Sequence, residues 1–509
     1  MRKYQWLLAF MALAVVARWG SFFISVINHD ESTYIVIADE MLRGEVYLRD
    51  LIDTKPIGIF WIYAALIKLT GGSILALRIA ASCVVGLGSF GLFMAGERVT
   101  GGKNFVASGG TRVGIAAGLI YLFICSLFTY YGVSPNTEIF FNVFTIASVA
   151  LAVAPRLNSR SADPAWHWPV TGFLLGLAMI IKPFAAAEAL AIGLFMVWYY
   201  GRQKAWGRII TSGAMLVGAF ALPLLFVYLY YQQLGMLDQL MFYTFDVSAA
   251  YPIELPWYLR LKYMGDYLLR FSPFVILGGG ALVQAWRWRS REEPNNKLLP
   301  SLLEREKLQW GIYLLLQFAL VTVVVLLTGK RFGHYQVQLH PVVALLAAMW
   351  WAPGTTVFPW LRRPGLRKYS FVLIFLVASM LGTAHYFAYA KKRDEPPKIA
   401  AYFKDKLGAD ETIFIINGFQ ISYHLLDKPV PTPYIHSSLL FYDHHVRAFQ
   451  IDEVAEANRI LNDPAVQYLV RRREDANAET PLTERLLPAF EEVDEIGDRL
   501  LVYRRKRME

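Results

Sequence analysis

The chain begins with an apolar run at residues 6–27, "WLLAFMALAVVARWGSFFISVI", followed directly by "NHDESTYIVIADEMLRG" at residues 28–44. A bilayer core of roughly 30 Å is crossed by about 20 apolar residues, so the run predicts a transmembrane helix. It is longer than the apolar core of a usual signal peptide, and we expect it to be retained. The sequence then places two adjacent carboxylates, Asp30 and Glu31, where the chain leaves the membrane.

The composition of the whole chain predicts a polytopic membrane protein. Of 509 residues, 56% are apolar and 18% are charged, whereas about a quarter of the residues in a soluble domain are charged. About eleven segments have the length and apolarity expected of transmembrane helices. They lie near residues 5–27, 73–97, 113–131, 138–154, 169–182, 184–200, 209–231, 269–286, 309–328, 336–352 and 370–390.

Lysine and arginine gather at alternate ends of these segments, as expected of cytoplasmic loops. This pattern predicts a cytoplasmic N-terminus and, after an odd number of crossings, a C-terminal domain on the outside. The net charge of +10 therefore reflects membrane topology, and we assign no nucleic-acid partner. The basic clusters are Arg2 and Lys3; Arg98, Lys103 and Arg112; Arg156 and Arg160; Arg202, Lys204 and Arg208; 287–307; and 362–368.

Two domains are expected, a transmembrane domain over residues 1–394 and an outer domain over 395–509. The outer part has a mixed, charged composition and alternating helix and strand patterns, which favour a small α/β domain. The expected fold class is therefore mainly α, with a small C-terminal α/β domain. The predicted outer elements are a helix in 396–408, a strand in 411–418, a helix in 452–463, a strand in 466–472 and a hairpin in 490–506 around Gly497.

The first outer loop, residues 28–72, is long enough to be functional. Apolar residues recur in it at helical spacing and predict an amphipathic helix on the membrane surface, with Gly44 as its C-terminal stop. These apolar residues are Tyr34, Ile37, Ala38, Met41 and Leu42.

Each charged residue of this loop has two interpretations. Asp30 is either the N-cap of the surface helix or a catalytic carboxylate. Lys55, in "DLIDTKPIGIFWIYA" at residues 50–64, either extends to the headgroups or binds an anion.

Further ionisable residues lie at helix ends near the predicted membrane. Glu138 opens the fourth segment, where it either favours the helix dipole or serves the site, and Lys182 lies at the turn between the fifth and sixth segments. Glu188 lies one turn deeper, where Lys182 is a possible partner. Such residues are costly near hydrocarbon and are functional candidates.

A last cluster, "GKRFGHYQVQLHP" at residues 329–341, joins the ninth and tenth segments on the outer side. One or two of its residues are explained by interfacial anchoring. Four together favour a phosphate-binding patch. They are Lys330, Arg331, His334 and Tyr335.

The sequence offers little support for a metal or another cofactor. Asp30, Glu31 and Asp53 carry oxygen ligands suited to a hard divalent cation, but no ligand run of definite spacing exists. "YDHHVRAF" at 442–449 is interpreted as a solvated loop of the outer domain. No Gly-rich phosphate loop follows a strand, and the two cysteines, Cys83 and Cys125, provide no disulfide framework. We expect no cofactor.

The first outer loop and the helix after it resemble the GT-C glycosyltransferases that use polyprenyl-phosphate sugars. These include the protein O-mannosyltransferases, the lipid A aminoarabinose transferase and the galacturonosyltransferases of lipopolysaccharide core. In that family an Asp-Glu pair follows the first helix, a Tyr comes a few residues later, and a Lys-Pro follows the amphipathic helix. The matching residues here are Asp30, Glu31, Tyr34, Lys55 and Pro56.

The resemblance extends over roughly residues 5–390 and includes two departures. Tyr335 and Pro341 match the family's basic-aromatic motif. Ile57 stands where many members have a second proline, and the second acidic position, Glu138, is less sharply marked.

The resemblance implies an inverting transfer of a sugar from a polyprenyl phosphate to an outer acceptor, which is a glycolipid, lipopolysaccharide, polysaccharide or protein. Asp30 would be the base, with its pKa raised by desolvation, and Glu31 would position the sugar or share the proton. The implied placement is a bacterial inner membrane with a periplasmic catalytic face. The residues implied to bind the lipid phosphate are Lys55, Arg331, Tyr335, His334 and Arg260, with Tyr34, Glu138 and Lys182 as secondary candidates.

Two other classes compete with an enzyme. A multi-pass flippase or transporter of lipid-linked sugars would also have many apolar helices and a basic outer patch, although the two repeated halves of many transporters are not detected. A non-catalytic scaffold would tolerate replacement of the loop carboxylates and Lys55.

Overall fold

The computed structural model describes residues 2–100, 110–128, 132–156, 164–250, 255–289, 298–330, 333–351, 364–436, 438–475 and 479–506. The chain forms two compact units. The first comprises Met1–Phe22, Arg78–Val227 and Ile253–Ala388, and the second comprises Phe23–Leu77, Tyr228–Pro252 and Tyr389–Glu509. The expected domain boundary at residue 395 stays a prediction.

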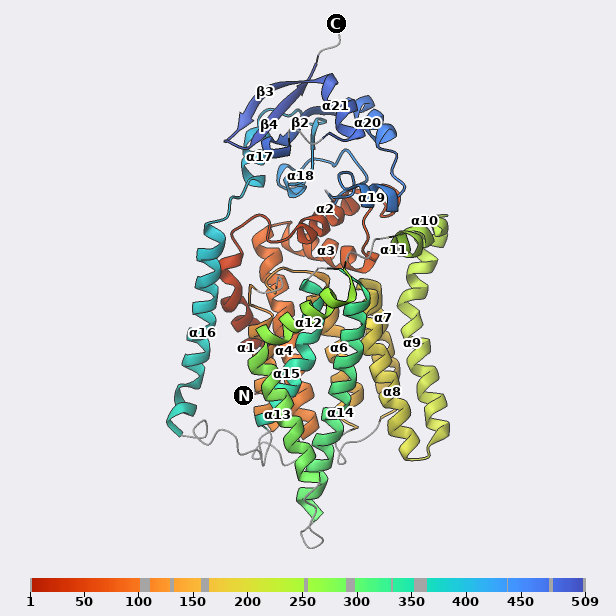
Figure 1. Cartoon of the computed structure of the whole chain (residues 1–509), viewed down its shortest axis with the longest axis vertical. Helices are drawn as coiled ribbons and strands as arrows, with labels where there is room; N and C mark the ends of the chain where they lie inside the picture. Colours follow the sequence, from red (N-terminus) through yellow and green to blue (C-terminus); the bar gives the residue numbers. More distant parts are fainter. Residues whose placement is uncertain are drawn as a thin grey trace. The chain divides into compact units, whose positions relative to one another are not determined.

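The first unit is built from helices, of which α4, α9 and α16 extend a few residues past its limits (Figure 1). Short 3-10 and π-helical turns, labelled η, continue or link several of them. The bounds are α1 Lys3–Arg18, η1 Trp19–Ser21, α4 Ile74–Thr100, α5 Gly110–Ile124, α6 Thr137–Ser148, η4 Val149–Val153, α7 His167–Ile181, η5 Pro183–Ala185, α8 Ala186–Arg202, α9 Trp206–Gln233, α12 Trp257–Arg270, α13 Ser272–Arg289, α14 Leu298–Leu327, η7 Gly333–Leu339, α15 His340–Ala348, η8 Met349–Trp351 and α16 Pro364–Ala390.

Each predicted apolar segment overlaps one of these helices, so the prediction of a mainly helical, multi-pass membrane protein is confirmed. Within the described residues, five helices are long and apolar enough to cross a membrane, or six if α12 and α13, bent by 85° at their junction, form one span. The five are α4, α8 with η5, α9, α14 and α16. Shorter apolar helices include α5, α7 and α6 with η4.

The first apolar segment becomes a shorter helix than predicted, because α1 ends at Arg18. This side chain is buried, and its Nε donates a hydrogen bond to Ser82 Oγ at 3.1 Å. Its Nη1 and Nη2 donate to the carbonyl oxygens of Cys125, Gly132 and Val133. A buried guanidinium needs such partners, and these bonds hold the end of α1 to α4 and to the chain after α5.

Small residues let helices of this unit approach closely. A Cβ atom at Gly20 would lie 2.1 Å from the carbonyl oxygen of Gly382, and one at Gly382 would lie 2.2 Å from the Trp19 ring. Glycine is therefore required on both sides of the contact between the end of α1 and α16, as in the small-residue interfaces of membrane helices. Elsewhere in the unit, α15 packs against both α13 and α14 (Figure 1).

The second unit combines helices with one four-stranded sheet of order β1-β2-β4-β3 (Figure 1). Strand β1 pairs with β2 in parallel, whereas β4 pairs antiparallel with β2 and β3. Gly497, with φ of +64°, turns the β3–β4 hairpin as predicted. The elements are α2 His29–Arg43, α3 Ile57–Thr70, α10 Leu237–Met241, η6 Phe242–Asp246, α11 Val247–Ala250, α17 Pro396–Phe403, β1 Thr412–Ile415, α18 Ile421–Leu426, α19 Asp443–Ala448, α20 Glu453–Asn462, β2 Val466–Arg472, η10 Arg473–Asp475, α21 Pro481–Leu486, η11 Leu487–Ala489, β3 Phe490–Ile496 and β4 Leu500–Arg505.

Two apolar cores cover opposite faces of this sheet, since successive strand residues point to opposite sides. Ile413 and Ile415 of β1 pack with Ile399 and Phe403 of α17. Phe414, between them, packs with residues of α20 and α21. This layered arrangement confirms the predicted α/β organisation of the C-terminal residues.

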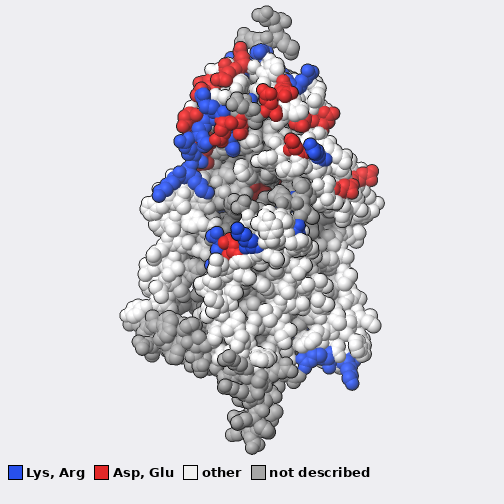
Figure 2. All heavy atoms as spheres, in the orientation of Figure 1, with Lys and Arg blue, Asp and Glu red and all other residues white. Residues whose placement is uncertain are grey.

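The charged side chains are distributed unevenly over the molecule. Figure 2 shows acidic and basic side chains gathered over the elements from α17 to β4, whereas the visible helices of the first unit are mostly uncharged. Many large apolar side chains of α9 and α16 are exposed, including Phe226 and Met380. An apolar surface of this kind suits contact with lipid.

Candidate active site

Helix α2 begins with a side-chain cap. The Oδ1 atom of Asn28 accepts a hydrogen bond from the backbone amide of Asp30 at 3.1 Å, which makes Asn28 the N-cap. The interpretation of Asp30 as the cap is therefore wrong: its carboxylate lies one residue inside the first turn and is available for other contacts. The helix ends at Gly44, whose φ of +109° suits glycine, as predicted.

The loop that carries Lys55 is held by a buried tyrosine. The hydroxyl of Tyr47 lies 2.9 Å from the carbonyl oxygen of Asp53 and 2.5 Å from that of Lys55. The ring of Tyr47 packs on Phe60 of α3, with centroids 4.5 Å apart. Pro56 then caps α3 with a fixed φ of −61°. The backbone position of Lys55 is therefore well defined.

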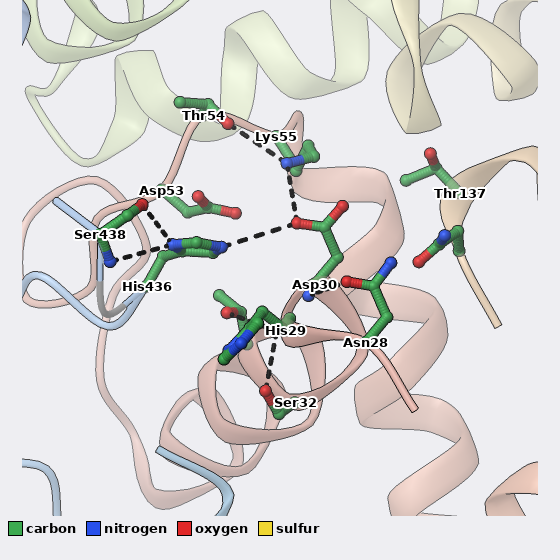
Figure 3. A network of polar contacts seen from close by, with 12 residues as sticks. Asn28, His29, Asp30, Ser32, Asp53, Thr54, Lys55, Thr137, His436 and Ser438 are labelled. Carbon is green, nitrogen blue, oxygen red and sulfur yellow. Dashed lines mark hydrogen bonds and ion pairs between the residues drawn. The ribbon is translucent and has the colours of Figure 1, made fainter. Parts of the chain in front are cut away.

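Asp30 and Lys55 form an ion pair. Lys55 Nζ lies 3.5 Å from Asp30 Oδ1, and the two side chains are 17% and 13% exposed (Figure 3). The same Nζ lies 3.4 Å from Thr54 Oγ1. The structure thus brings together the two loop residues that the sequence singled out.

A residue from the C-terminal part joins this pair. His436 Nε2 lies 3.7 Å from Asp30 Oδ1 (Figure 3). Burial lowers the pKa of His436, although the charges of Asp53 and Asp30 oppose the effect. Asp53 is also buried, and its Oδ2 atom accepts no hydrogen bond from the described residues. The site therefore combines a carboxylate, an ammonium and an imidazole, with a second carboxylate close enough to act on the imidazole by its charge.

Glu31 and Tyr34 are buried on other sides of α2. Successive helix residues point about 100° apart, so Glu31 diverges from Asp30, and its Oε2 accepts a hydrogen bond from the amide of Ile27 at 3.3 Å. The ring of Tyr34 packs between Phe60 and Tyr63, with centroids 5.9 and 5.5 Å away. These contacts give both residues packing functions, and their proposed roles in transfer stay predictions.

Helix α2 is more buried than the predicted amphipathic surface helix. All residues from Glu31 to Ala38 are buried, and exposed side chains occur at the two ends of the helix, at His29 and at Leu42, which is 45% exposed. The reason is that α3 packs on it from the loop side and α18 from the C-terminal side. Gln420, just before α18, donates from Nε2 to Thr33 Oγ1 at 3.1 Å.

In the first unit, Glu138 and Lys182 form a buried ion pair. Glu138 opens α6, and Lys182 follows α7 with an extended backbone. The Lys182 Nζ also lies 3.9 Å from the centre of the Tyr335 ring, a favourable cation–π geometry. The structure thus brings together Glu138, Lys182 and Tyr335. The suggested pairing of Lys182 with Glu188 is wrong. Lys182 pairs with Glu138, and Glu188 accepts a hydrogen bond from Gln338 Nε2 at 2.7 Å.

The other predicted phosphate ligands of this unit are less informative. Arg260 donates from Nε to the carbonyl oxygen of Leu255 and from Nη1 to that of Leu326, which links α12 to the end of α14. His334 is buried beside Tyr335, with ring centroids 4.7 Å apart. Arg331 lies outside the described residues.

The donor set does not point to a metal. Among the residues that the structure describes, no three side chains of His, Cys, Asp or Glu come together as a candidate metal site. Near 442–449, His445 Nδ1 instead lies 3.0 Å from the carbonyl oxygen of Ser438, which is a packing contact of α19.

The sequence did not predict the contacts that three residues make near the ion pair: Asn28, Tyr47 and His436. Asn28 had a usable signal, because asparagine is as good an N-cap as aspartate. Tyr47 and His436 had none, since their contacts depend on how the loop folds and on which part of the C-terminal segment docks on it.

Comparisons with known proteins agree with the fold. Residues 54–231 match the sequence family described as dolichyl-phosphate-mannose-protein mannosyltransferase. No curated protein matches the chain. The crystal structure of ArnT from Cupriavidus metallidurans bound to undecaprenyl phosphate aligns with a TM-score of 0.60, 15% identity and 98% of each chain covered. Its apo state aligns with a TM-score of 0.52 and 15% identity, covering 99% of this chain and 98% of that one.

Proposed function

We propose that the chain transfers a sugar from a polyprenyl phosphate to an extracytoplasmic acceptor. The premise is that residues 54–231 match the dolichyl-phosphate-mannose-protein mannosyltransferase family and that the chain has the GT-C fold of the ArnT structure. The observation that carries the proposal is the ion pair between Asp30 and Lys55. It joins a carboxylate that can take a proton to an ammonium that can bind a phosphate. The matching ArnT structure, which binds undecaprenyl phosphate, supports this donor class.

Asp30 acts in the proposed reaction as the general base. The carboxylate is 13% exposed and lies inside the first turn of α2, where the helix dipole favours its charged form. It accepts the proton of the acceptor hydroxyl or amine as that atom attacks the anomeric carbon. A general base of this kind contributes about 10²–10⁴-fold to the rate.

Lys55 acts on the leaving group. The bond from the anomeric carbon to the phosphate oxygen breaks as the new glycosidic bond forms, and its electron pair stays on the lipid phosphate. A positioned ammonium stabilises this developing charge. Because attack and departure occur on opposite faces, the anomeric configuration inverts. No metal or other cofactor takes part in the proposed step.

The remaining assignments follow from the same proposal. By the resemblance, Glu31 positions the sugar, and Arg331, Tyr335, His334 and Arg260 stay predicted phosphate ligands, with Tyr34, Glu138 and Lys182 in secondary roles. The membrane is a bacterial inner membrane with the α/β part in the periplasm. The acceptor is a glycoconjugate, such as lipopolysaccharide, or a protein.

The test is mass spectrometry of lipid and glycan fractions from cells that contain the wild-type chain or Asp30→Asn at matched abundance. The proposal expects one polyprenyl-phosphate sugar to accumulate in the variant while one glycoconjugate loses that sugar. Asp405→Asn is the matched control, since Asp405 is an exposed carboxylate of the second unit. Unchanged profiles in Asp30→Asn would overturn the proposal and favour a flippase.

A further inference from the structure

The segment that carries His436 is fixed on the first outer loop. The amide of Ile52 donates to the carbonyl oxygen of Pro433 at 2.7 Å, and Ile52 pairs with Tyr434 as an isolated β-bridge. Ile52 is 5% exposed and belongs to the same apolar core as Leu439 and the sheet residue Phe414. Residues 433–436 therefore hold a defined register against the loop that ends in Asp53 and Lys55.

The contacts of His436 define its neutral tautomer. The Nδ1 atom lies 3.3 Å from the backbone nitrogen of Ser438 and 2.7 Å from its Oγ (Figure 3). A backbone amide only donates hydrogen bonds, so Nδ1 is the acceptor and the ring proton lies on Nε2. This Nε2–H group faces Asp30 Oδ1 at 3.7 Å, which is longer than a hydrogen bond but short enough for the positive end of the N–H dipole to stabilise the charged carboxylate.

The charges around His436 come from three parts of the second unit. Helix α2 contributes Asp30 and His29, and the first outer loop contributes Asp53 and Lys55. Arg472, at the end of β2, acts on His29 by its charge. Burial lowers the pKa of His436, and this agrees with the neutral tautomer that the Ser438 amide requires.

We propose that His436 is a positioning residue for Asp30: its Nε2–H group orients the carboxylate and favours its charged form. The effect of this contact on catalysis rests on the proposed function. A donor to the charged form of a carboxylate lowers the pKa of that carboxylate. His436 thus keeps Asp30 ready to accept a proton, while Ser438 fixes which nitrogen carries the hydrogen.

Two substitutions separate positioning from packing. The amide nitrogen of glutamine reaches the position of histidine Nε2, so His436→Gln keeps a donor toward Asp30. The amide of asparagine reaches only the position of Nδ1, so His436→Asn keeps an acceptor for Ser438 and loses the donor. If His436 served only packing, the proton affinity of Asp30 would be the same in the two variants.

The first readout is independent of sugar transfer. Carbodiimides modify the protonated carboxyl group, so the pH midpoint of Asp30 modification in the full-length, reconstituted protein reports its proton affinity. Trypsin releases Asp30 in the peptide 19–43, which contains no internal Lys or Arg, and fragment ions separate it from Glu31. We expect the midpoint of His436→Asn to rise by about one pH unit, a tenfold change in proton affinity, and that of His436→Gln to stay near the wild-type value.

The second readout is the pH dependence of transfer. In His436→Asn, kcat falls about tenfold and the acid limb of the kcat profile moves to higher pH, with little change in KM for the donor. His436→Gln restores both. Equal labelling midpoints in the wild type and both variants would overturn the inference whether or not the chain transfers a sugar. A wild-type chain that transfers no sugar, with the expected midpoint shift, would overturn the proposed function and leave the contact of His436 with Asp30 established.

Discussion

Lys55 Nζ and Asp30 Oδ1 lie 3.5 Å apart, and both side chains are mostly buried without being closed off from solvent. Each residue comes from a different helix boundary: Asp30 from the first turn of α2, and Lys55 from the residue before the cap of α3. A phosphate that binds Lys55 therefore arrives beside the carboxylate. In the proposed reaction, this relationship would connect binding of the donor with activation of the acceptor.

The first prediction concerns Lys55→Met. Loss of a charge-assisted hydrogen bond to a phosphate costs about 1.5–3 kcal/mol, so we expect affinity for a polyprenyl phosphate to fall by about 10–150-fold. Calorimetry or quenching of intrinsic fluorescence in detergent measures this affinity. Lys404→Met, which removes an exposed lysine of the second unit, is the control. Equal affinities in both variants would contradict a phosphate-binding role for Lys55.

The sequence was sufficient to identify Asp30 and Lys55 as site candidates, because both lie close together in the chain and beside local signals for the start or end of a helix. Gly44 defines where α2 ends and Pro56 where α3 begins, and both signals lie in the same stretch of sequence as the two charges. After residue 395, α17, β1, α20, β2 and the β3–β4 hairpin were predictable for the same reason, since their periodicity is a local property. Helices α18, α19 and α21 were not predicted, and the interpretation of 442–449 as a solvated loop was wrong, because α19 forms there and buries His445.

The rest of the site depends on contacts between distant parts of the chain. Glu138 and Lys182 are 44 positions apart, and no sequence period predicts that Lys182 pairs with Glu138 rather than Glu188. The approach of His436 to Asp30 depends on the register between Ile52 and Tyr434. The role of Arg18 was not predicted, because three of its hydrogen-bond partners are backbone carbonyl groups, which carry no sequence signal, and the fourth, Ser82, is 64 positions away.

The second prediction concerns Tyr47→Phe. The substitution keeps the ring against Phe60 and removes the hydroxyl that contacts the carbonyl groups of Asp53 and Lys55. We expect it to cost about 1 kcal/mol of stability and to raise hydrogen exchange in residues 47–56. Tyr402→Phe, which removes a hydroxyl bonded to Asp494 on β3, should leave that segment unchanged. Unaltered exchange in Tyr47→Phe would show that the loop is held by other contacts.

The third prediction is a pH dependence at the contact between α2 and α18. His424 lies 3.0 Å from Asp39 through Nδ1 and 2.8 Å from the carbonyl oxygen of Gly72 through Nε2. Burial opposes its charge, but these two hydrogen bonds prevail and raise the pKa of His424 above 6.5. On α2, burial raises the pKa of Glu40 from 4.5 to about 7, against the attraction of Arg43.

Both shifts act in the same direction on stability. A raised pKa means that the folded state holds its proton more tightly than the unfolded state, so stability falls as pH rises. For Glu40 the loss runs from about pH 4.5 to about pH 7, and for His424 it begins near pH 6.5 and continues through its folded-state pKa. The other charges at this contact are those of Asp39, Glu45 and Asp427.

Hydrogen exchange of α2 and α18 between pH 5 and 8, corrected for intrinsic rates, measures this effect. Protection should decrease as pH rises. Glu40→Gln removes its part of the dependence, because glutamine does not titrate, and His424→Gln removes the other part. A flat profile in the wild-type chain would contradict the prediction, and an unchanged slope in both variants would assign it to other groups.

The last prediction concerns the ion pair of Glu138 and Lys182, whose side chains are 1% and 5% exposed. Removing one partner of a buried pair leaves an uncompensated charge and typically costs about 3–5 kcal/mol. Glu138→Gln and Lys182→Met should therefore each lower the thermal stability of the purified protein strongly. The double variant should recover much of the loss, because two neutral groups then replace the pair.

Activity separates this structural effect from a role in transfer. If the pair serves the reaction, the double variant regains stability and stays inactive; if the pair is only structural, activity returns with stability. Glu188→Gln is the matched control, since Glu188 is equally buried and its partner, Gln338, is neutral, so neutralising it leaves no unpaired charge. Additive losses of stability in the double variant would contradict the pairing itself, because residues that interact directly do not act independently.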